Sequence, residues 1–102
     1  MEIAAFEKLL ASKERKFRIT AHALIRITER AFNKDIIENE IQTGTPVLVV
    51  EEPCDVAGEQ KLRIYYKQSG PHYHAYIIAL NAGITVITVW RENKEIQKRI
   101  RK

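Results

Sequence analysis

His22, Arg26 and Arg30 recur at four-residue intervals, a spacing that would place a histidine and two arginines on one face of an α-helix. Arginine presents a planar fork of donors that fits a phosphate group, and histidine transfers protons near neutral pH. RNA cleavage without a metal needs a base for the 2′-hydroxyl, an acid for the leaving oxygen and cations around the phosphate. The row of three residues would supply some of these parts.

The same helix face has a second interpretation, as an ordinary solvated surface. Glu29 follows Arg26 by three positions, a spacing that forms ion pairs on exposed helices. The opposite side of the helix carries apolar side chains that we expect to dock on a sheet, namely Leu24, Ile25, Ile27, Ala31 and Phe32. Spacing alone leaves both interpretations open.

A second group of candidate residues lies between positions 65 and 76, where tyrosines and histidines are concentrated. His74 and Tyr76 share one face of a strand, because side chains two positions apart point the same way. We assign His74 as a second candidate proton-transfer residue beside His22. His72 and His74 have the spacing of a metal-chelating pair, but no cysteine or carboxylate completes a familiar site, so we expect no metal and no other cofactor.

Basic and aromatic residues in the second half of the chain are candidates for contacts with RNA. Lysine and arginine bind phosphates, while aromatic rings stack on unpaired bases. The candidates for such contacts are Arg63, Lys67, Tyr73, Tyr76 and Arg91. The alternative is that the tyrosines are half-buried strand residues whose hydroxyls reach water.

Helices are predicted in the first half of the chain. Apolar residues recur at helical spacing in three segments, residues 2–14, 21–32 and 34–43. Thr20 and Asn33 are of the types that cap helix amino termini, and each directly precedes one of these segments. We expect the third helix to stop at Gly44, in the left-handed conformation that glycine tolerates.

The rest of the chain is predicted to form strands. Their expected bounds are residues 46–52, 61–66, 73–80 and 84–91. The last two form a hairpin, and residues 17–20 form a short extended segment. In the last strand we expect Val86 and Trp90 on one face and Val89 on the other, as in a strand covered on both sides. The predicted class is α+β, with amino-terminal helices packed on a four-stranded, mainly antiparallel sheet.

Length and composition predict one domain with an ordinary globular core. The chain has 102 residues, of which 45% are hydrophobic and 29% charged. We divide it into an extra amino-terminal helix (1–16), a core (17–92) and a basic tail (93–102). One cysteine excludes an internal disulfide, no apolar run has the length of a membrane helix, and no signal peptide is visible. We therefore expect a cytoplasmic protein without a membrane partner.

The net charge of +4 lies entirely at the carboxyl end. Residues 1–90 hold 11 basic and 11 acidic side chains, whereas residues 91–102 hold six basic and two acidic ones. A basic terminus attracts polyanions such as nucleic acid, with an affinity that falls as salt rises. The alternative is that these charges only keep the end of the chain soluble. No glycine-rich phosphate loop or nucleophile elbow is present, so the familiar nucleotide-hydrolysing motifs are not supported.

The stretch from Ile19 to Arg30, which reads I-T-A-H-A-L-I-R-I-T-E-R, resembles the family called domain of unknown function 4258. The shared pattern is an extended pair, then H-A-x-x-R-x-x-E-R on a helix, a short helix of the D-I-I-E type, and a later strand ending V-I-T-V plus an aromatic. The resemblance extends over residues 17–92. It reaches His22, Arg26, Arg30 and Glu29, but it does not reach His72 or His74.

The resemblance implies kinship with the small RelE-like and barnase-like toxin ribonucleases, in which helices precede a four-stranded antiparallel sheet. It also implies a toxin–antitoxin setting, with an antitoxin-like protein as partner. The leading hypothesis is a toxin-like, metal-independent endoribonuclease in which His22, Arg26, Arg30 and His74 are catalytic. The alternative is a non-catalytic module that binds nucleic acid or protein. Convergence of His22 and His74 in one concavity favours the enzyme, and separate positions favour the binding module.

Overall fold

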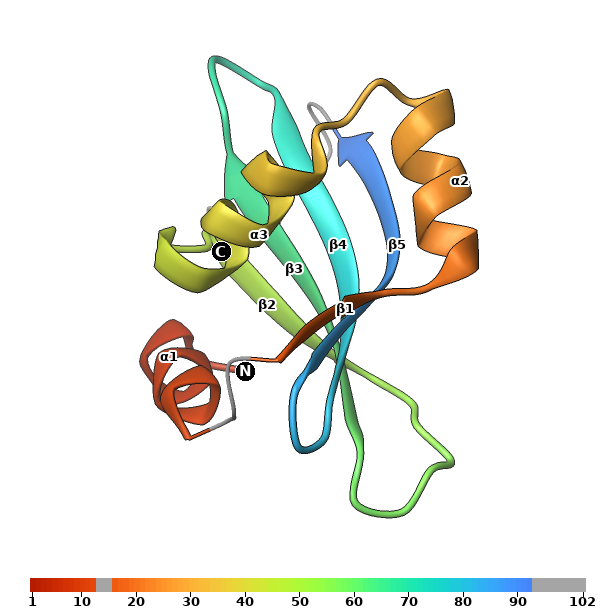
Figure 1. Ribbon diagram of the computed structural model, residues 1–102. Helices are drawn as coiled ribbons and strands as arrows, with labels where there is room; N and C mark the ends of the chain where they lie inside the picture. Colours follow the sequence, from red (N-terminus) through yellow and green to blue (C-terminus); the bar gives the residue numbers. More distant parts are fainter. Residues whose placement is uncertain (13–15, 93–102) are drawn as a thin grey trace.

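The computed structural model describes residues 1–12 and 16–92, which form helices and one sheet (Figure 1). The helices are α1 (Ile3–Ala11), α2 (Ala21–Glu29) and α3 (Lys34–Thr43). The strands are β1 (Phe17–Ile19), β2 (Leu48–Glu52), β3 (Gln60–Lys67), β4 (Tyr73–Leu80) and β5 (Ile84–Glu92). The predicted α+β class is therefore confirmed. The basic tail and residues 13–15 lie outside the described residues. None of the described helices has the length and apolar character needed to cross a membrane.

The sheet has five strands in the order β1-β5-β4-β3-β2, and not the four that the sequence predicted. The additional strand is β1, which runs parallel to β5 with Phe17 opposite Ile84 and Ile19 opposite Val86. All other neighbours are antiparallel. A strand of three residues is too short to show a period of two, which is why the sequence indicated only an extended segment.

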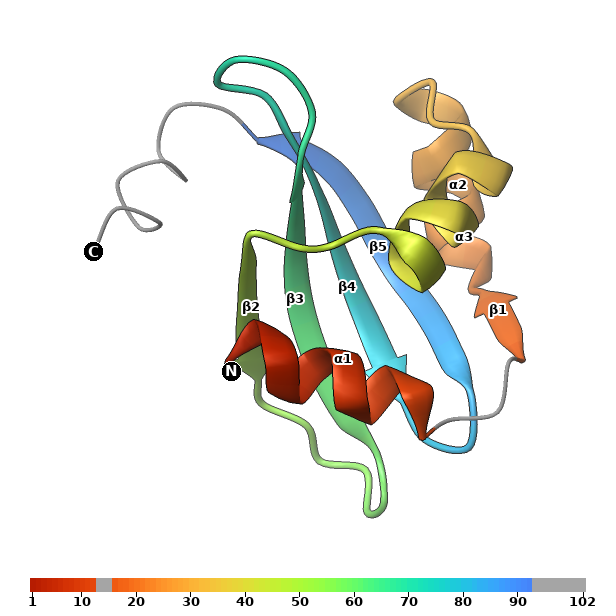
Figure 2. The same ribbon diagram turned by 90° about the vertical axis from the view of Figure 1, so that its left-hand side faces the viewer.

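The helices bury their apolar sides in one common core. Figures 1 and 2 show α2 and α3 over one face of the sheet, with α1 beside β2. Phe6 of α1, Ile27 of α2, and Ile37 and Ile41 of α3 belong to this core. Its sheet residues include Leu62, Ile64, Ile78, Val86 and Val89. The helices thus fix the positions of their polar residues relative to β4 and β5.

The helix starts agree with the predicted caps. Thr20 Oγ1 accepts a hydrogen bond from the amide of Ala23 at 3.1 Å, and Asn33 Oδ1 accepts one from the amide of Asp35 at 2.8 Å. The predicted bounds of α3 are confirmed, whereas α2 ends at Glu29 rather than at residue 32. Ala31 interrupts the helix because its φ of 53° is left-handed.

Gly44 ends α3 in a different way from the one predicted. Its φ of −78° and ψ of 163° are extended, so the expected left-handed conformation was wrong. A Cβ atom at this position would lie 2.6 Å from the carbonyl oxygen of Glu40. Glycine is therefore required by the close approach of the backbone, and not by a special φ.

A bulge in β5 changes which of its side chains face the core. The pairing with β4 shifts between Ile77 and Ile78, which stand opposite Thr88 and Val86 respectively. The extra residue in β5 puts Val86 and Val89 in the same core, while Trp90 packs with Tyr65 in a second cluster. The expected division, with Val86 and Trp90 on one face, was wrong because strict alternation does not continue through a bulge.

Candidate functional site

Helix α2 packs on β5 through a narrow stripe, which leaves its flanks available. Ala23 and Ile27 are the buried residues of this helix. Leu24 and Ile25 are 45% and 56% exposed, so the expectation that both dock on the sheet was wrong. α2 lies beside β5 near the edge of the sheet, so its contact with the core is limited to the stripe that holds Ala23 and Ile27. One flank carries His22, Arg26 and Arg30 towards β5.

The row on α2 forms one wall of a groove of about 670 Å³. The other wall comes from β5, which contributes Thr88, Trp90 and Arg91. The structure therefore brings the predicted row together with Arg91, which the sequence had suggested separately as an RNA contact. β1 pairs only with residues Ile84 to Val86 of β5, so the groove runs along the part of this edge that no described strand covers.

Backbone carbonyl groups hold two of the arginines in the groove. Arg30 Nη1 donates a hydrogen bond to the carbonyl of Val89. Arg91 donates through Nη1 to the carbonyl of Arg30 and through Nη2 to that of Ala31, and its guanidinium lies 4.1 Å from the centre of the Phe32 ring. A guanidinium has five N–H donors, so each side chain keeps donors for an anion. These arginines are thus held in place before any ligand binds.

Arg26 has an acidic neighbour on its own helix. Its Nη1 lies 3.1 Å from Glu29 Oε2, and both side chains are substantially exposed. Exposed pairs of this kind contribute about 0–1 kcal/mol. A phosphate group is therefore able to replace Glu29 as the partner of Arg26 at little cost.

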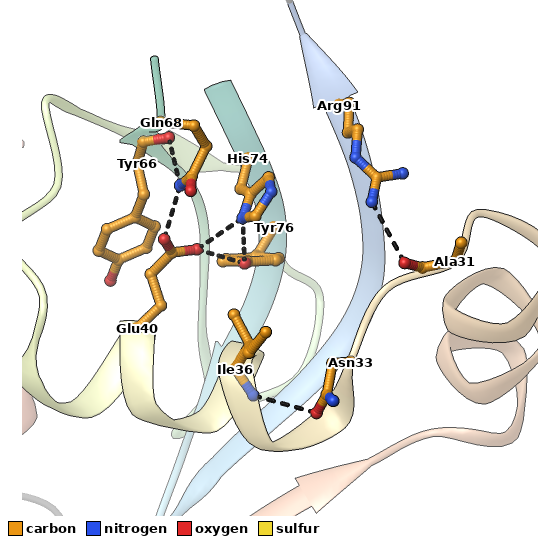
Figure 3. Close-up of polar contacts among 9 residues, drawn as sticks. All are labelled: Ala31, Asn33, Ile36, Glu40, Tyr66, Gln68, His74, Tyr76 and Arg91. Carbon is orange, nitrogen blue, oxygen red and sulfur yellow. Dashed lines mark hydrogen bonds and ion pairs between the residues drawn. The ribbon is translucent and has the colours of Figure 1, made fainter. Parts of the chain in front are cut away.

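His74 lies in a different environment, a cluster around the carboxylate of Glu40 (Figure 3). Glu40 Oε1 accepts hydrogen bonds from the Tyr76 hydroxyl and from His74 Nδ1, the latter at 3.0 Å. Glu40 Oε2 accepts a third from Gln68 Nε2 at 2.6 Å. Three side chains, from β4 and the loop after β3, thus share the one carboxylate that α3 provides.

The charges in this cluster follow from burial and hydrogen bonding. Burial raises the pKa of Glu40, but the hydrogen bonds from His74, Tyr76 and Gln68 and the charge of His74 outweigh burial and lower it below the ordinary value of 4.5. Burial also raises the pKa of the Tyr76 hydroxyl, as does its hydrogen bond to Glu40. The cluster therefore holds an ionised carboxylate beside a neutral tyrosine.

The two candidate histidines do not share the groove. His22 lines it, while His74 does not. The side chain of Arg91 and the ring of Phe32 lie between the groove and His74. Arg91 stacks on the Phe32 ring, and the centres of the Phe32 and His74 rings are 4.9 Å apart. By the criterion of convergence, this arrangement favours binding over catalysis that uses both histidines together.

The remaining predicted contact residues lie elsewhere. Arg63 pairs with Glu52 at 3.0 Å, beside the second cluster of buried residues. Tyr73 and Tyr76 are 3% and 0% exposed, so neither ring is available for stacking on a base. Lys67 is exposed at the end of β3, and it does not line the groove.

Sequence reasoning missed two features of the site, the groove-lining role of Trp90 and the role of Glu40. Glu40 follows Ile37 by three positions and precedes Ile41, so it shares the buried face of α3. A carboxylate on an apolar helix face needs a partner. That signal was present in the sequence, but the partner on β4 was not identifiable from spacing.

The residues that the structure describes contain no group of three or more histidine, cysteine or acidic side chains placed to hold a metal ion. Comparisons with protein-family models, with curated proteins and with solved structures found no match to this chain.

Proposed function

We propose that this protein binds the phosphate backbone of single-stranded RNA in the groove between α2 and β5. The observation that carries the proposal is the convergence of Arg26, Arg30 and Arg91, from two different elements, on one groove. Guanidinium groups bind phosphate oxygens with paired hydrogen bonds and keep their charge at any working pH. Residues 1–90 are neutral overall, so the positive groove is a local concentration of charge.

The aromatic residue of the groove favours a single strand over a duplex. Trp90 is half-buried between the groove and Tyr65, and its Nε1 donates to Glu92 at 2.8 Å. This hydrogen bond holds the indole in position. Unpaired bases stack on aromatic side chains, whereas the bases of a duplex are already stacked on one another. The resemblance to the family called domain of unknown function 4258 supports the same substrate class.

The test is the salt dependence of binding to a fluorescent single-stranded RNA of mixed sequence. Arg30→Ala is expected to weaken binding and to lower the slope of log Kd against log salt by about 1, the contribution of one phosphate contact. Lys8→Ala is the matched control, because it removes the same charge from an exposed position on α1. Equal effects of the two substitutions would show that the positive charge of the protein attracts RNA without a specific site, and would contradict the proposal.

Metal-independent cleavage of the bound RNA is the second candidate function. The observation that favours it is the presence of His22 in the same groove as the arginines. We expect the wild-type protein to cleave RNA equally with and without EDTA, and Arg30→Ala to cleave more slowly than Lys8→Ala. Cleavage that disappears with EDTA would contradict this candidate and leave the binding proposal standing.

A further inference from the structure

A row of apolar and aromatic side chains crosses the sheet on the face that points away from α2 and α3. Leu48 of β2 is paired with Tyr65 of β3, and Tyr65 is paired with Ala75 of β4. Ala75 is paired in turn with Trp90 of β5, and Tyr73 lies on the same face two positions before Ala75. These residues belong to the second cluster of buried residues, which we call the back-face cluster. Figure 2 shows α2 and α3 on the other side of the sheet, and no described member of the back-face cluster comes from a helix.

The back-face cluster is buried more deeply than its own layer explains. Tyr65 is 1% exposed and Tyr73 is 3% exposed. Side chains of a strand stand roughly perpendicular to the sheet, so neighbours in the same layer cover the flanks of a ring but not its outer end. The contacts of the Tyr65 ring with Trp90 at 6.2 Å and with the Arg63 guanidinium at 5.9 Å are of this lateral kind. Burial to this degree therefore requires a further layer of chain over the back face.

The segment that follows β5 starts in the right place to form this layer. Glu92, the last residue of β5, stands opposite Tyr73, so the chain leaves the sheet beside the back-face cluster. Ile96 and Ile100 are four positions apart and would share one face of a helix. The opposite face of that helix would carry Lys94, Lys98 and Lys102. One apolar side and one basic side are typical of a helix that packs on a sheet and faces water.

The length of the segment also fits the width of the cluster. The sheet order places three strand spacings between β5 and β2, or about 14 Å. The ten residues 93–102 would span about 15 Å as a helix, enough to cross from Trp90 to Leu48. The other segment outside the described residues, 13–15, ends beside Lys16, whose carbonyl accepts a hydrogen bond from Ile84 at the opposite end of β5. Residues 13–15 are therefore not placed to cover this cluster.

We propose that residues 93–102 form a helix that packs across the back-face cluster, with Ile96 over Ala75 and Ile100 over Tyr65 and Leu48. The hydrophobic effect favours this docking, because it removes the two isoleucines and the outer ends of the rings from water. The basic side of the helix then faces solvent. The inference goes beyond the proposed function, since the docking of this segment needs no RNA.

The first experiment uses the fluorescence of Trp90, the single tryptophan of the chain and a member of the cluster. Ile96→Ser combined with Ile100→Ser in the full chain is expected to shift its emission to longer wavelength and to increase its quenching by acrylamide, because water reaches the indole. Lys94→Ser combined with Lys98→Ser is the matched control, with the same spacing on the opposite side of the helix. We expect wild-type emission from the control. Equal emission and quenching in all three proteins would overturn the inference.

The second experiment needs no substitution, so it does not depend on how well a variant folds. NMR of the wild-type chain is expected to show nuclear Overhauser contacts between the methyl groups of Ile100 and the ring of Tyr65. Contacts between Ile96 and the methyl group of Ala75 are expected as well. Absence of contacts from both isoleucines to the back-face cluster would overturn the inference, whatever the fluorescence of the variants.

A second copy of the chain is the other occupant that the experiments must distinguish. In a mixture of isotope-labelled and unlabelled protein, we expect no contacts between the two kinds of chain, and we expect Trp90 emission to stay the same on dilution. Contacts between labelled and unlabelled chains at the back-face cluster would show that another copy covers it, and would overturn the inference. Neither experiment contains RNA, so failure of the protein to bind RNA would contradict the proposed function alone.

Discussion

The carboxylate of Glu40 accepts hydrogen bonds from three side chains, those of Gln68, His74 and Tyr76. Its lowered pKa means that folding favours the ionised form. The resulting stability is fully present above the ordinary value of 4.5 and is lost as the pH falls through the lower pKa of the folded state. Acid should therefore destabilise this protein partly through one side chain.

We predict that Glu40→Gln lowers the free energy of unfolding at neutral pH by about 1–3 kcal/mol, because charge-assisted hydrogen bonds are lost. We also predict that its stability falls less than that of the wild type between neutral pH and acid. Urea unfolding over that range measures both effects. Glu29→Gln is the control, because that residue is exposed. If the free energy of unfolding fell equally with pH in the wild type and in Glu40→Gln, Glu40 would not be a source of the acid sensitivity.

Tyr76 should make the protein sensitive to alkali. Its pKa is raised above the ordinary value of 10.0 by burial and by the hydrogen bond to Glu40, so folding disfavours its ionised form. The contribution of Tyr76 to the free energy of unfolding is then fully present below the pKa of the tyrosine in the unfolded chain, and it falls as the pH rises above that pKa. Tyr76→Phe is expected to reduce this alkaline loss, which unfolding experiments above pH 10 measure. Tyr66, whose pKa burial also raises, should account for part of the loss that remains.

At the scale of single residues, spacing along the sequence predicted which candidate residues share one helix face, but not which residues of different elements lie together. The row of His22, Arg26 and Arg30 follows from the helical repeat, because that geometry is local. Arg91 and Glu40 enter their sites through the packing of α2 on β5 and of α3 on β4. Those contacts depend on the tertiary fold, which no local pattern encodes.

The element most sensitive to a small change is the end of α3. A methyl group at Gly44 would meet the backbone carbonyl of Glu40, and a backbone carbonyl has little freedom to move. Gly44→Ala should therefore destabilise the protein by about 1–3 kcal/mol through overpacking. Urea unfolding measures the change, with Thr43→Ala on the exposed side of the same turn as control. Equal stability of the two variants would show that α3 relaxes without cost.

Elements with strong local signals were predicted well, and those set by pairing were not. Thr20 and Asn33 cap their helices as expected, and the predicted bounds of α3 and β4 are confirmed, because caps and turns act within a few residues. β1 is a strand only because it pairs with the edge of β5. The pairing continues directly after β1, where the amide of Thr20 donates to the carbonyl of Val86 at 3.1 Å. The bulge in β5 likewise depends on the register with β4.

For the whole molecule, the charge of the carboxyl tail should add to the affinity of the groove. The tail, residues 93–102, has a net charge of +4, equal to that of the whole chain, and lies outside the described residues. Replacing Lys98, Arg99 and Arg101 by glutamine in the full chain is expected to lower the salt slope of RNA binding by up to about 3, one unit for each phosphate contact. An unchanged slope would show that these charges serve solubility alone.

The pairing of β1 with β5 has a consequence for protein synthesis. The chain emerges amino terminus first, and domains fold as units once their parts are available. Thr20 Oγ1 donates to the carbonyl of Ile87, a residue 67 positions later, so the start of α2 is attached to a strand that is made only after β4. A nascent chain that ends before β5 carries Arg26 and Arg30 but has no groove. The proposed phosphate site therefore forms only after β5 has been made, and a chain released before that point would lack it.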